Sequence, residues 1–407
     1  MRLFVIPLLL LALCAAQAHC KEESGPETLP PVPPSVIPTD LSKDVKCVEA
    51  EEAAPLPPQF WGSADFWVAW IRGVTFPTLV TVGPASDPIP GALNQNGTTV
   101  RFGGDQTPHE RLGARFEFGA WFDDANSFGL QAGGAFLASR SVGSHDSSPG
   151  TPVLARPFYD VDGQQQNASL ASFPGTASGT IDVHSGTRLY NVDANGVMVP
   201  VSNPVYAVRL LAGFRYFDLH DDLAIAENVL VSPVAMVPTA GQNIGVRDNF
   251  ACDNCFYGGN LGFSATYDMR LFELVVKAQC ALGMTQECVN IAGATRIDGG
   301  PVIPAGLLAV SSNSGGHERN AFAVLPELEV DARFEVSRHV VVSAGYSVLY
   351  WSNVARAGQQ VDTNVNLNLV PTSTTYGQAG GPSQPQASIH DTYFWAQGIH
   401  FGLELRF

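Results

Sequence analysis

The sequence has little positive charge. It contains 22 Lys and Arg residues against 38 Asp and Glu residues, so its formal net charge at pH 7 is −16. Nucleic acid is therefore excluded as the expected partner, because its phosphates repel so acidic a chain. Lysine is especially scarce: from residue 58 onward Lys277 is the only one, and the other basic residues are arginines. Arginine suits fixed pairing with carboxylates, so we expect interior ion pairs.

The sequence also lacks the motifs of common enzymes. It has no phosphate-binding loop, no dinucleotide fingerprint, no G-x-S-x-G elbow and no histidine cluster at metal-ligand spacing. Segments 160–163 and 193–196 begin like calcium loops but lack the distal Glu, and both are interpreted as turns. His390-Asp391 is interpreted as a polar loop rather than a catalytic dyad. We predict no enzymatic activity, no cofactor and no metal.

Long apolar runs are missing beyond the N-terminus. No later stretch approaches the ~18 apolar residues of a membrane-spanning helix. Residues 1–18 combine Arg2 with an apolar run and an A-x-A site, which is typical of a secretory signal peptide. Residues 19–58 are acidic and proline-rich and are predicted to form an extended linker. Residues 59–407 then form one domain.

Cysteine is rare, and six cysteines follow the predicted signal peptide. An even number in an exported chain favours disulfides. The candidates within the domain are Cys252, Cys255, Cys280 and Cys288. A four-thiolate zinc site is less favoured, because the spacing of the last two is long and export disfavours reduced thiols. The pairing stays open, since six cysteines allow 15 pairings.

Alternation of apolar and polar residues is abundant, whereas helical periodicity is absent. In segment 327–336, Leu328, Val330 and Phe334 share one face, while Glu327, Glu329, Asp331 and Arg333 share the other. Similar patterns occupy 114–122, 206–216, 272–278, 340–351 and 393–407. A period of two predicts strands, so the fold class is all-β.

The connections between these strands alternate between short and long. They are tight after Phe122, Phe217, Tyr267 and Val336, with the turn after Phe217 assigned to His220-Asp221-Asp222. Long loops are predicted at 73–109, 140–203, 232–250, 297–319 and 352–390. This alternation is typical of a transmembrane antiparallel up-and-down β-barrel with short periplasmic turns and long external loops. The count gives ten strands, or twelve if 99–104, or 152–158 with 180–185, adds a hairpin. A soluble β-sandwich is the rival architecture.

The last predicted strand carries a further signal. Tyr393, Trp395, Phe401 and Phe407 fall in one register, and they are interpreted as an insertion signal for an outer-membrane barrel. The expected partners are outer-membrane lipid and the barrel-assembly machinery. The expected location is the bacterial outer membrane.

Several phrases together resemble a known family. They are Phe60-Trp61-Gly62-Ser63, Leu211-Ala212-Gly213-Phe214-Arg215-Tyr216, Phe256-Tyr257-Gly258-Gly259, Leu325-Pro326-Glu327-Leu328, Leu349-Tyr350-Trp351-Ser352-Asn353-Val354 and Trp395-Ala396-Gln397-Gly398-Ile399. The chain resembles the bacterial β-barrel porin family numbered seven over about residues 59–407. The resemblance implies an outer-membrane barrel and implies no substrate.

The polar register carries the functional hypothesis. If the apolar faces meet lipid, the charged residues between them point inward and line a pore: Arg115, Glu117, Arg209, Arg215, Glu273, Lys277, Glu327, Glu329, Asp331, Arg333, Glu404 and Arg406. The alternative is that they pair into salt bridges without conduction. We predict a porin-like passive channel for small solutes or ions, with cation preference from Glu327, Glu329 and Asp331. The alternative function is a non-conducting surface barrel that acts as an adhesin or scaffold through its loops.

Overall fold

The computed structural model describes residues 58–107, 109–235 and 239–407. These residues belong to one compact unit, Pro55–Phe407. The predicted signal peptide, the predicted linker up to residue 57, and Cys20 and Cys47 lie outside the described residues. Within the described ranges, no helix has the length and apolar character needed to cross a membrane.

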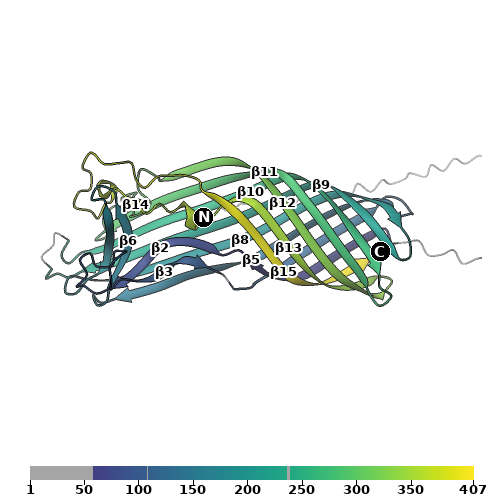
Figure 1. Ribbon diagram of the computed structural model, residues 1–407, viewed down its shortest axis with the longest axis horizontal. Coiled ribbons are helices and arrows are strands. Elements are labelled where there is room, and N and C mark those ends of the chain that lie inside the picture. Colours follow the sequence, from purple (N-terminus) through teal and green to yellow (C-terminus); the bar gives the residue numbers. More distant parts are fainter. Residues whose placement is uncertain (1–57, 108, 236–238) are drawn as a thin grey trace, which may run out of the picture. The chain divides into compact units, whose positions relative to one another are not determined.

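Ten antiparallel strands form a closed barrel in which each strand pairs with its neighbours in chain order (Figure 1). The strands are β1 (Phe60–Ile71), β4 (Arg111–Trp121), β5 (Phe128–Ser148), β8 (Ala177–Ser202), β9 (Tyr206–Val231), β10 (Asn243–Asp268), β11 (Glu273–Ile297), β12 (Gly315–Ser337), β13 (Val340–Ala355) and β15 (Asp391–Arg406). The ring closes because β1 pairs with both β4 and β15. At this seam Phe60 and Phe407 exchange backbone hydrogen bonds of 2.9 and 2.8 Å. The predicted all-β up-and-down barrel is confirmed, at ten strands.

A second, smaller sheet covers one end of the barrel. Its order is β14 (Asn364–Val365), β6 (Val153–Asp160), β2 (Val74–Gly83) and β3 (Thr99–Gln106), and β7 (Gln165–Ser172) pairs with β6. Figure 1 shows β2, β3, β6 and β14 at the end of the barrel opposite the C-terminus. The short 3-10 helices η1 (Ala357–Gln360) and η2 (Leu367–Leu369) belong to the same cover. Segments 99–104 and 152–158 therefore build this sheet and add no strands to the ring.

The predicted strand assignment contains two errors, which leave the predicted count of ten unchanged because one strand was divided in two and another was missed. The turn predicted at His220-Asp221-Asp222 is wrong, because β9 runs without a break from Tyr206 to Val231. The loop predicted over 140–203 is also wrong, because it contains the outer part of β5 and the whole of β8. The actual tight turn lies at 203–205, between β8 and β9. The predicted tight turns after Phe122, Tyr267 and Val336 are confirmed.

The two segments whose sequences begin like calcium loops adopt different structures. At 160–163, the backbone N–H groups of Asp162 and Gly163 both donate to Asp160 Oδ1 at 3.1 Å, so the predicted turn is confirmed. The turn predicted at 193–196 is wrong, because these residues lie inside β8. There Asn195 donates to Asp193 at 2.7 Å within the barrel.

The polarity of the barrel wall reverses along its strands. On β9, Phe214 faces outward and is 52% exposed, whereas Arg215 faces inward and is buried. Farther along the same strand, Leu223 and Ile225 face inward and are buried, while the outward positions hold polar or small residues such as Asp222. One half of the wall is therefore built for lipid outside, and the other half for water outside and an apolar core inside.

Tyrosines mark the limits of the lipid-facing half. On β9 these limits are Tyr206 and Tyr216, and on β10 they are Tyr267 and Tyr257. Ten residues rise roughly 33 Å along a strand, or about 25 Å when the strand is tilted by ~40°, which matches the apolar band of an outer-membrane barrel. At the outer limit Tyr216 packs between Tyr190 and Tyr257, with ring centroids 6.1 and 5.1 Å away. We call the segment between these limits the membrane band, and the remainder beyond Tyr216 and Tyr257 the outer half.

The membrane band excludes the soluble sandwich. Its outward positions are occupied by exposed large apolar side chains on strands all round the ring: Phe66, Phe118, Phe136, Phe214, Phe263, Leu282, Leu328, Tyr346 and Phe401. In a sandwich these residues would be covered by a second layer. The alternation that predicted a lipid-facing wall is therefore interpreted correctly within this band.

Candidate functional site: the barrel lumen

The inner wall of the membrane band carries charges of both signs from several strands. Arg115 and Glu117 come from β4, Lys277 from β11, and Glu327 and Glu329 from β12. Each faces inward because neighbouring positions on its strand face lipid. A small cavity of about 80 Å³ lies between these side chains. Its volume is enough for several water molecules.

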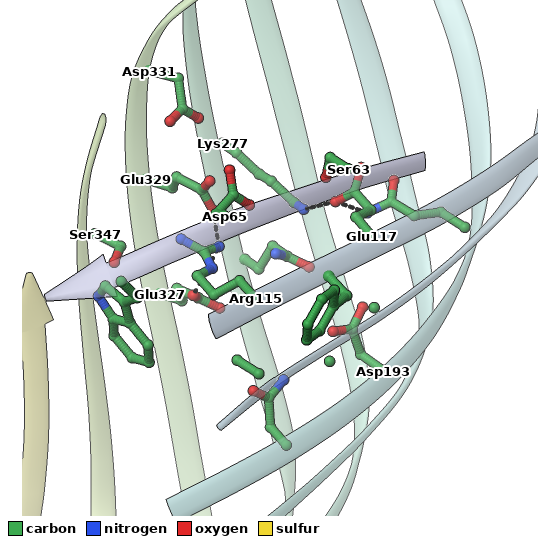
Figure 2. A pocket seen from close by; sticks show the side chains of 18 of the residues that line it. Ser63, Asp65, Arg115, Glu117, Asp193, Lys277, Glu327, Glu329, Asp331 and Ser347 are labelled. Carbon is green, nitrogen blue, oxygen red and sulfur yellow. Dashed lines mark hydrogen bonds and ion pairs between the residues drawn. The ribbon is translucent and has the colours of Figure 1, made fainter. Parts of the chain in front are cut away.

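The charges on this wall are paired across the lumen (Figure 2). Arg115 contacts Glu329 and lies 3.9 Å from Glu327. Arg215 also pairs with Glu327. Lys277 Nζ lies 2.9 Å from Glu117 Oε2. These pairs offset the charges of Glu327 and Glu329 on β12 and of Glu117 on β4.

A triad of Glu329, Asp331 and His400 lies beside Arg115. Its potential ligand atoms lie within 4.8 Å of one another, so it is the group in the described parts of the chain that could hold a metal ion. His400 Nε2 lies 2.6 Å from Asp331, and its Nδ1 lies 3.5 Å from Arg115 Nη1. An arginine that donates to Nδ1 leaves the proton on Nε2, which then donates to Asp331. This arrangement is that of an ion-pair network, and a cation would have to displace Arg115 from it.

A wider vestibule of about 720 Å³ lies at the turn end of the membrane band. Arg209 lines both this vestibule and the inner cavity. Its guanidinium carbon lies 5.6 Å from the centroid of the Trp121 ring. Arg338 and Arg406 also line the vestibule, and Arg406 pairs with Glu404 at 2.6 Å. Charged side chains therefore line the lumen from this end as far as the paired network.

An apolar layer closes the lumen at the outer limit of the membrane band. Trp351, Phe256 and Phe394 are fully buried, and Phe217 is 2% exposed. The Trp351 ring meets Phe217 and Phe256 edge-on, with centroids 6.0 and 6.1 Å apart. Its Nε1 donates to Thr285 Oγ1 at 2.8 Å, so the one polar atom of the ring is satisfied. Among the described residues, this layer of buried side chains separates the charged cavity from the outer half.

Above this layer, the outer half is filled by its own core. Leu307, Leu308, Ala309 and Val310 from the β11–β12 connection are buried inside the barrel mouth. Asp248 holds them there, because it accepts the backbone N–H groups of Leu307, Leu308 and Ala309 at 3.1, 3.0 and 2.8 Å. The connection predicted as an external loop is therefore a plug.

Two buried polar residues of the wall also hold the β13–β15 connection. Asp221 accepts from Arg356 Nε at 3.2 Å, from the Ala357 N–H at 2.9 Å and from Thr187 at 2.7 Å. Asn254 accepts from the Ala355 N–H at 2.6 Å and donates to its carbonyl at 2.9 Å. The aspartate that the sequence assigned to a turn is thus the anchor of the cover.

Comparison with known proteins identifies the family. A family model described as "Putative beta barrel porin-7 (BBP7)" matches residues 61–407. The chain belongs to this family. It is an outer-membrane β-barrel protein of the porin type, as the resemblance in the sequence implied, and its location is the bacterial outer membrane. No curated protein matches the chain.

Two solved structures are among those that align with this member of the porin-7 family. The protease OmpT from Escherichia coli aligns at 9% identity over 86% of this chain and 97% of its own, with a TM-score of 0.41. A FadL homologue from Pseudomonas aeruginosa aligns at 7% identity over 85% of this chain and 89% of its own, with a TM-score of 0.22. Likeness at this level carries no argument about activity.

The predicted pore-lining residues lie at different heights in this porin-type barrel. Those that line the inner cavity are Arg115, Glu117, Arg209, Arg215, Lys277, Glu327, Glu329, Asp331, Arg333 and Glu404. Arg406 lines the vestibule instead, and Glu273 lines neither space. The sequence analysis missed Asp65, Asp193 and His400. Strand alternation could have placed Asp65 and His400 on the inner wall, but Asp193 lay in a segment predicted to be a loop.

The predicted disulfides are wrong for the four cysteines of the barrel. Within the described residues, Cys252, Cys255, Cys280 and Cys288 are all free. Cys252 faces the core, whereas the other three face outward on β10 and β11. Cys255 lies opposite Gln286 and Cys288 opposite Asp253, which makes the two cysteines diagonal neighbours. Diagonal residues lie ~7–8 Å apart, too far for a disulfide.

Proposed function

We propose that this protein is a closed outer-membrane barrel that displays a folded β-domain at the cell surface, acting as a scaffold or adhesin rather than an open pore. One observation carries the proposal: the apolar layer around Trp351, continued by the core of the outer half, fills the cross-section above the charged cavity. Water and ions cross such a layer at high cost, because their hydrogen bonds would be lost. The role implies outer-membrane lipid and the barrel-assembly machinery as partners, and no catalytic activity.

A passive channel is the second candidate. It is favoured by the vestibule of about 720 Å³ and by the charged cavity, which together extend through much of the membrane band. Conduction would require displacement of the cover that Asp221 and Asn254 hold. Because Glu327 and Glu329 are already paired with arginines, these two residues add little to a cation preference of this candidate.

Planar-bilayer recording tests the two candidates. Refolded protein, with folding verified by heat-modifiable gel mobility, is expected to give no conductance steps. The variant Trp351→Ala, which opens the apolar layer, is expected to remain silent because the outer core still fills the mouth. Tyr350→Ala is the matched control, since this neighbour faces lipid.

Discrete steps in the wild type would refute the closed barrel. Steps that grow in Trp351→Ala but not in Tyr350→Ala would establish a channel through this layer.

A further inference from the structure

A second cavity lies in the outer half, between the edge strand β7 and the barrel wall. Its volume is about 520 Å³. Most of its lining is apolar and comes from β6, β7, β9, β10, the plug and the β14–β15 connection, including Phe158, Leu170, Val229, Val231, Ile244 and Leu367. Pockets that hold small molecules span ~300–1,000 Å³ and are mainly apolar, so this cavity has their size and character.

The walls of this cavity are held in place without a ligand. Val231 and Ile244 belong to ring strands, and Phe158 belongs to β6, which pairs with both β2 and β7. These side chains are 3–9% exposed although they line an open space. Water beside these apolar side chains finds few hydrogen-bonding partners, so an apolar molecule that replaces it gains favourable free energy.

One charged residue, Glu227, contributes to the lining. It is 2% exposed, and its Oε2 lacks a hydrogen bond within the described structure. Arg156 lies 3.6 Å away but is engaged more closely by Asp248, at 2.5 Å. Two buried carboxylates therefore share a single guanidinium, and Glu227 is the less well compensated of the two.

We propose that this cavity binds a compact, mainly apolar molecule that carries one hydrogen-bond-donating group directed at Glu227. A carboxylate only accepts hydrogen bonds, so the ligand must supply the donor. The excess of negative charge around Arg156 disfavours anionic ligands. The inner faces of β9 and β10 line the site together with β6 and β7 of the cover, so it lies inside the barrel mouth and exists only while the cover is in place.

A pair of fluorescent probes tests the site. N-phenyl-1-naphthylamine is apolar with one N–H donor, and 1-benzylnaphthalene has nearly the same shape with a CH2 group in place of the donor. With protein in lipid nanodiscs, and with empty nanodiscs subtracted, the amine is expected to bind saturably and about fivefold to tenfold more tightly than the hydrocarbon. In Glu227→Leu this preference is expected to fall to about one, since Asp248 still pairs with Arg156.

The location is tested by filling the cavity. Ala168→Trp places a ring in it from the edge strand β7 and is expected to weaken amine binding by about tenfold or more. Gln165→Trp is the matched control, because it lies on the same strand outside the lining. Absence of saturable binding, or unchanged binding in Ala168→Trp, would overturn the site. Equal affinity of the two probes for the wild type would overturn the role of Glu227.

Discussion

Single charged residues in the membrane band act through their partners. Arg115 contacts Glu329 and lies close to Glu327, inside a wall with lipid on its other side. Arg115→Met leaves these carboxylates short of positive charge, which costs about 3–5 kcal/mol when a buried pair loses one partner. We expect the free energy of unfolding of the variant, measured by urea titration in lipid, to fall by this amount.

The control for this change is an ion pair in water. Arg140 lies 3.9 Å from Glu110, and the two side chains are 44% and 53% exposed. Arg140→Met should lower the free energy of unfolding by no more than about 1 kcal/mol. Equal losses in Arg140→Met and Arg115→Met would contradict the view that pairing in the lumen stabilises the barrel.

On the outer half, the pKa of His220 depends on the acidic residue to which it is hydrogen-bonded. The hydrogen bond of 2.5 Å from His220 to Asp253 raises the pKa of His220 above 6.5 and lowers that of Asp253 below 3.8. A raised histidine pKa stabilises the fold below the unfolded value of 6.5, and this contribution is lost as pH rises through the folded value. The lowered pKa of Asp253 stabilises the fold above the unfolded value of 3.8, and this contribution is lost as pH falls through the folded value. The pair is therefore complete in mildly acidic solution.

NMR titration of His220 measures this directly. We expect a pKa above 6.5 in the wild type and a return toward 6.5 in Asp253→Asn. Asp222→Asn is the control, because Asp222 lies 3.8 Å away and should shift the pKa less. An unchanged His220 pKa in Asp253→Asn would exclude the pair.

At the level of elements, the inward-facing row of β13 requires a residue without a side chain at Gly345. A Cβ at Gly345 would overlap Asp331 Oδ1 and His400 Nε2, which come from the two strands beside it. Glycine there lets His400 reach Asp331 across β13. We expect Gly345→Ala to destabilise the barrel by about 1–3 kcal/mol, measured by urea unfolding.

Gly259→Ala provides the matched control for that glycine. Gly259 lies in β10, and a Cβ there meets nothing within 4 Å. The substitution should leave stability nearly unchanged, because it adds only a methyl group toward the outside. A similar loss of stability in Gly345→Ala and Gly259→Ala would contradict the view that the overlap of the new Cβ with Asp331 and His400 causes the loss at Gly345.

The strands of the membrane band could be predicted from the sequence, but the outer half could not. Alternation of apolar and polar residues predicts a strand correctly where one face of the strand meets lipid, as in segment 327–336. Beyond Tyr216 the apolar face of β9 turns inward and the outward face becomes polar, so His220, Asp221 and Asp222 resembled a turn. In β8, Asp193 and Asn195 fill the lumen between small outward residues, and this weakened the apolar signal there.

The candidate site was predictable in part for the same reason. A period of two gives the face of Glu329 or Arg333 but not its partner, because partners come from strands far apart in the chain. Arg115 and Glu329 are separated by 214 residues. The apolar seal was not predictable, since Trp351 and Phe394 resemble any other aromatic residue of a lipid-facing strand until the barrel is closed.

On the scale of the whole molecule, the reversal of polarity along the strands determines which part of the outer surface of the barrel is exposed to water. The chain carries its own probes of this boundary on one strand. Cys280 and Cys288 both face outward on β11, but Cys280 lies opposite Leu261, which is 65% exposed to lipid, whereas Cys288 lies opposite Asp253 in the outer half. Cys252 faces the core of the outer half and is buried.

A membrane-impermeant maleimide applied to intact cells should therefore modify Cys288 and leave Cys280 and Cys252 unmodified, as judged by peptide mass spectrometry. Unfolding in urea before labelling should make all three react, which controls for intrinsic reactivity. Because eight positions separate Cys280 from Cys288 on the same face, roughly 26 Å along the strand, a boundary between them is well resolved. Modification of Cys280 in intact cells would mean that the lipid-facing band is misplaced, and with it the height of the seal around Trp351.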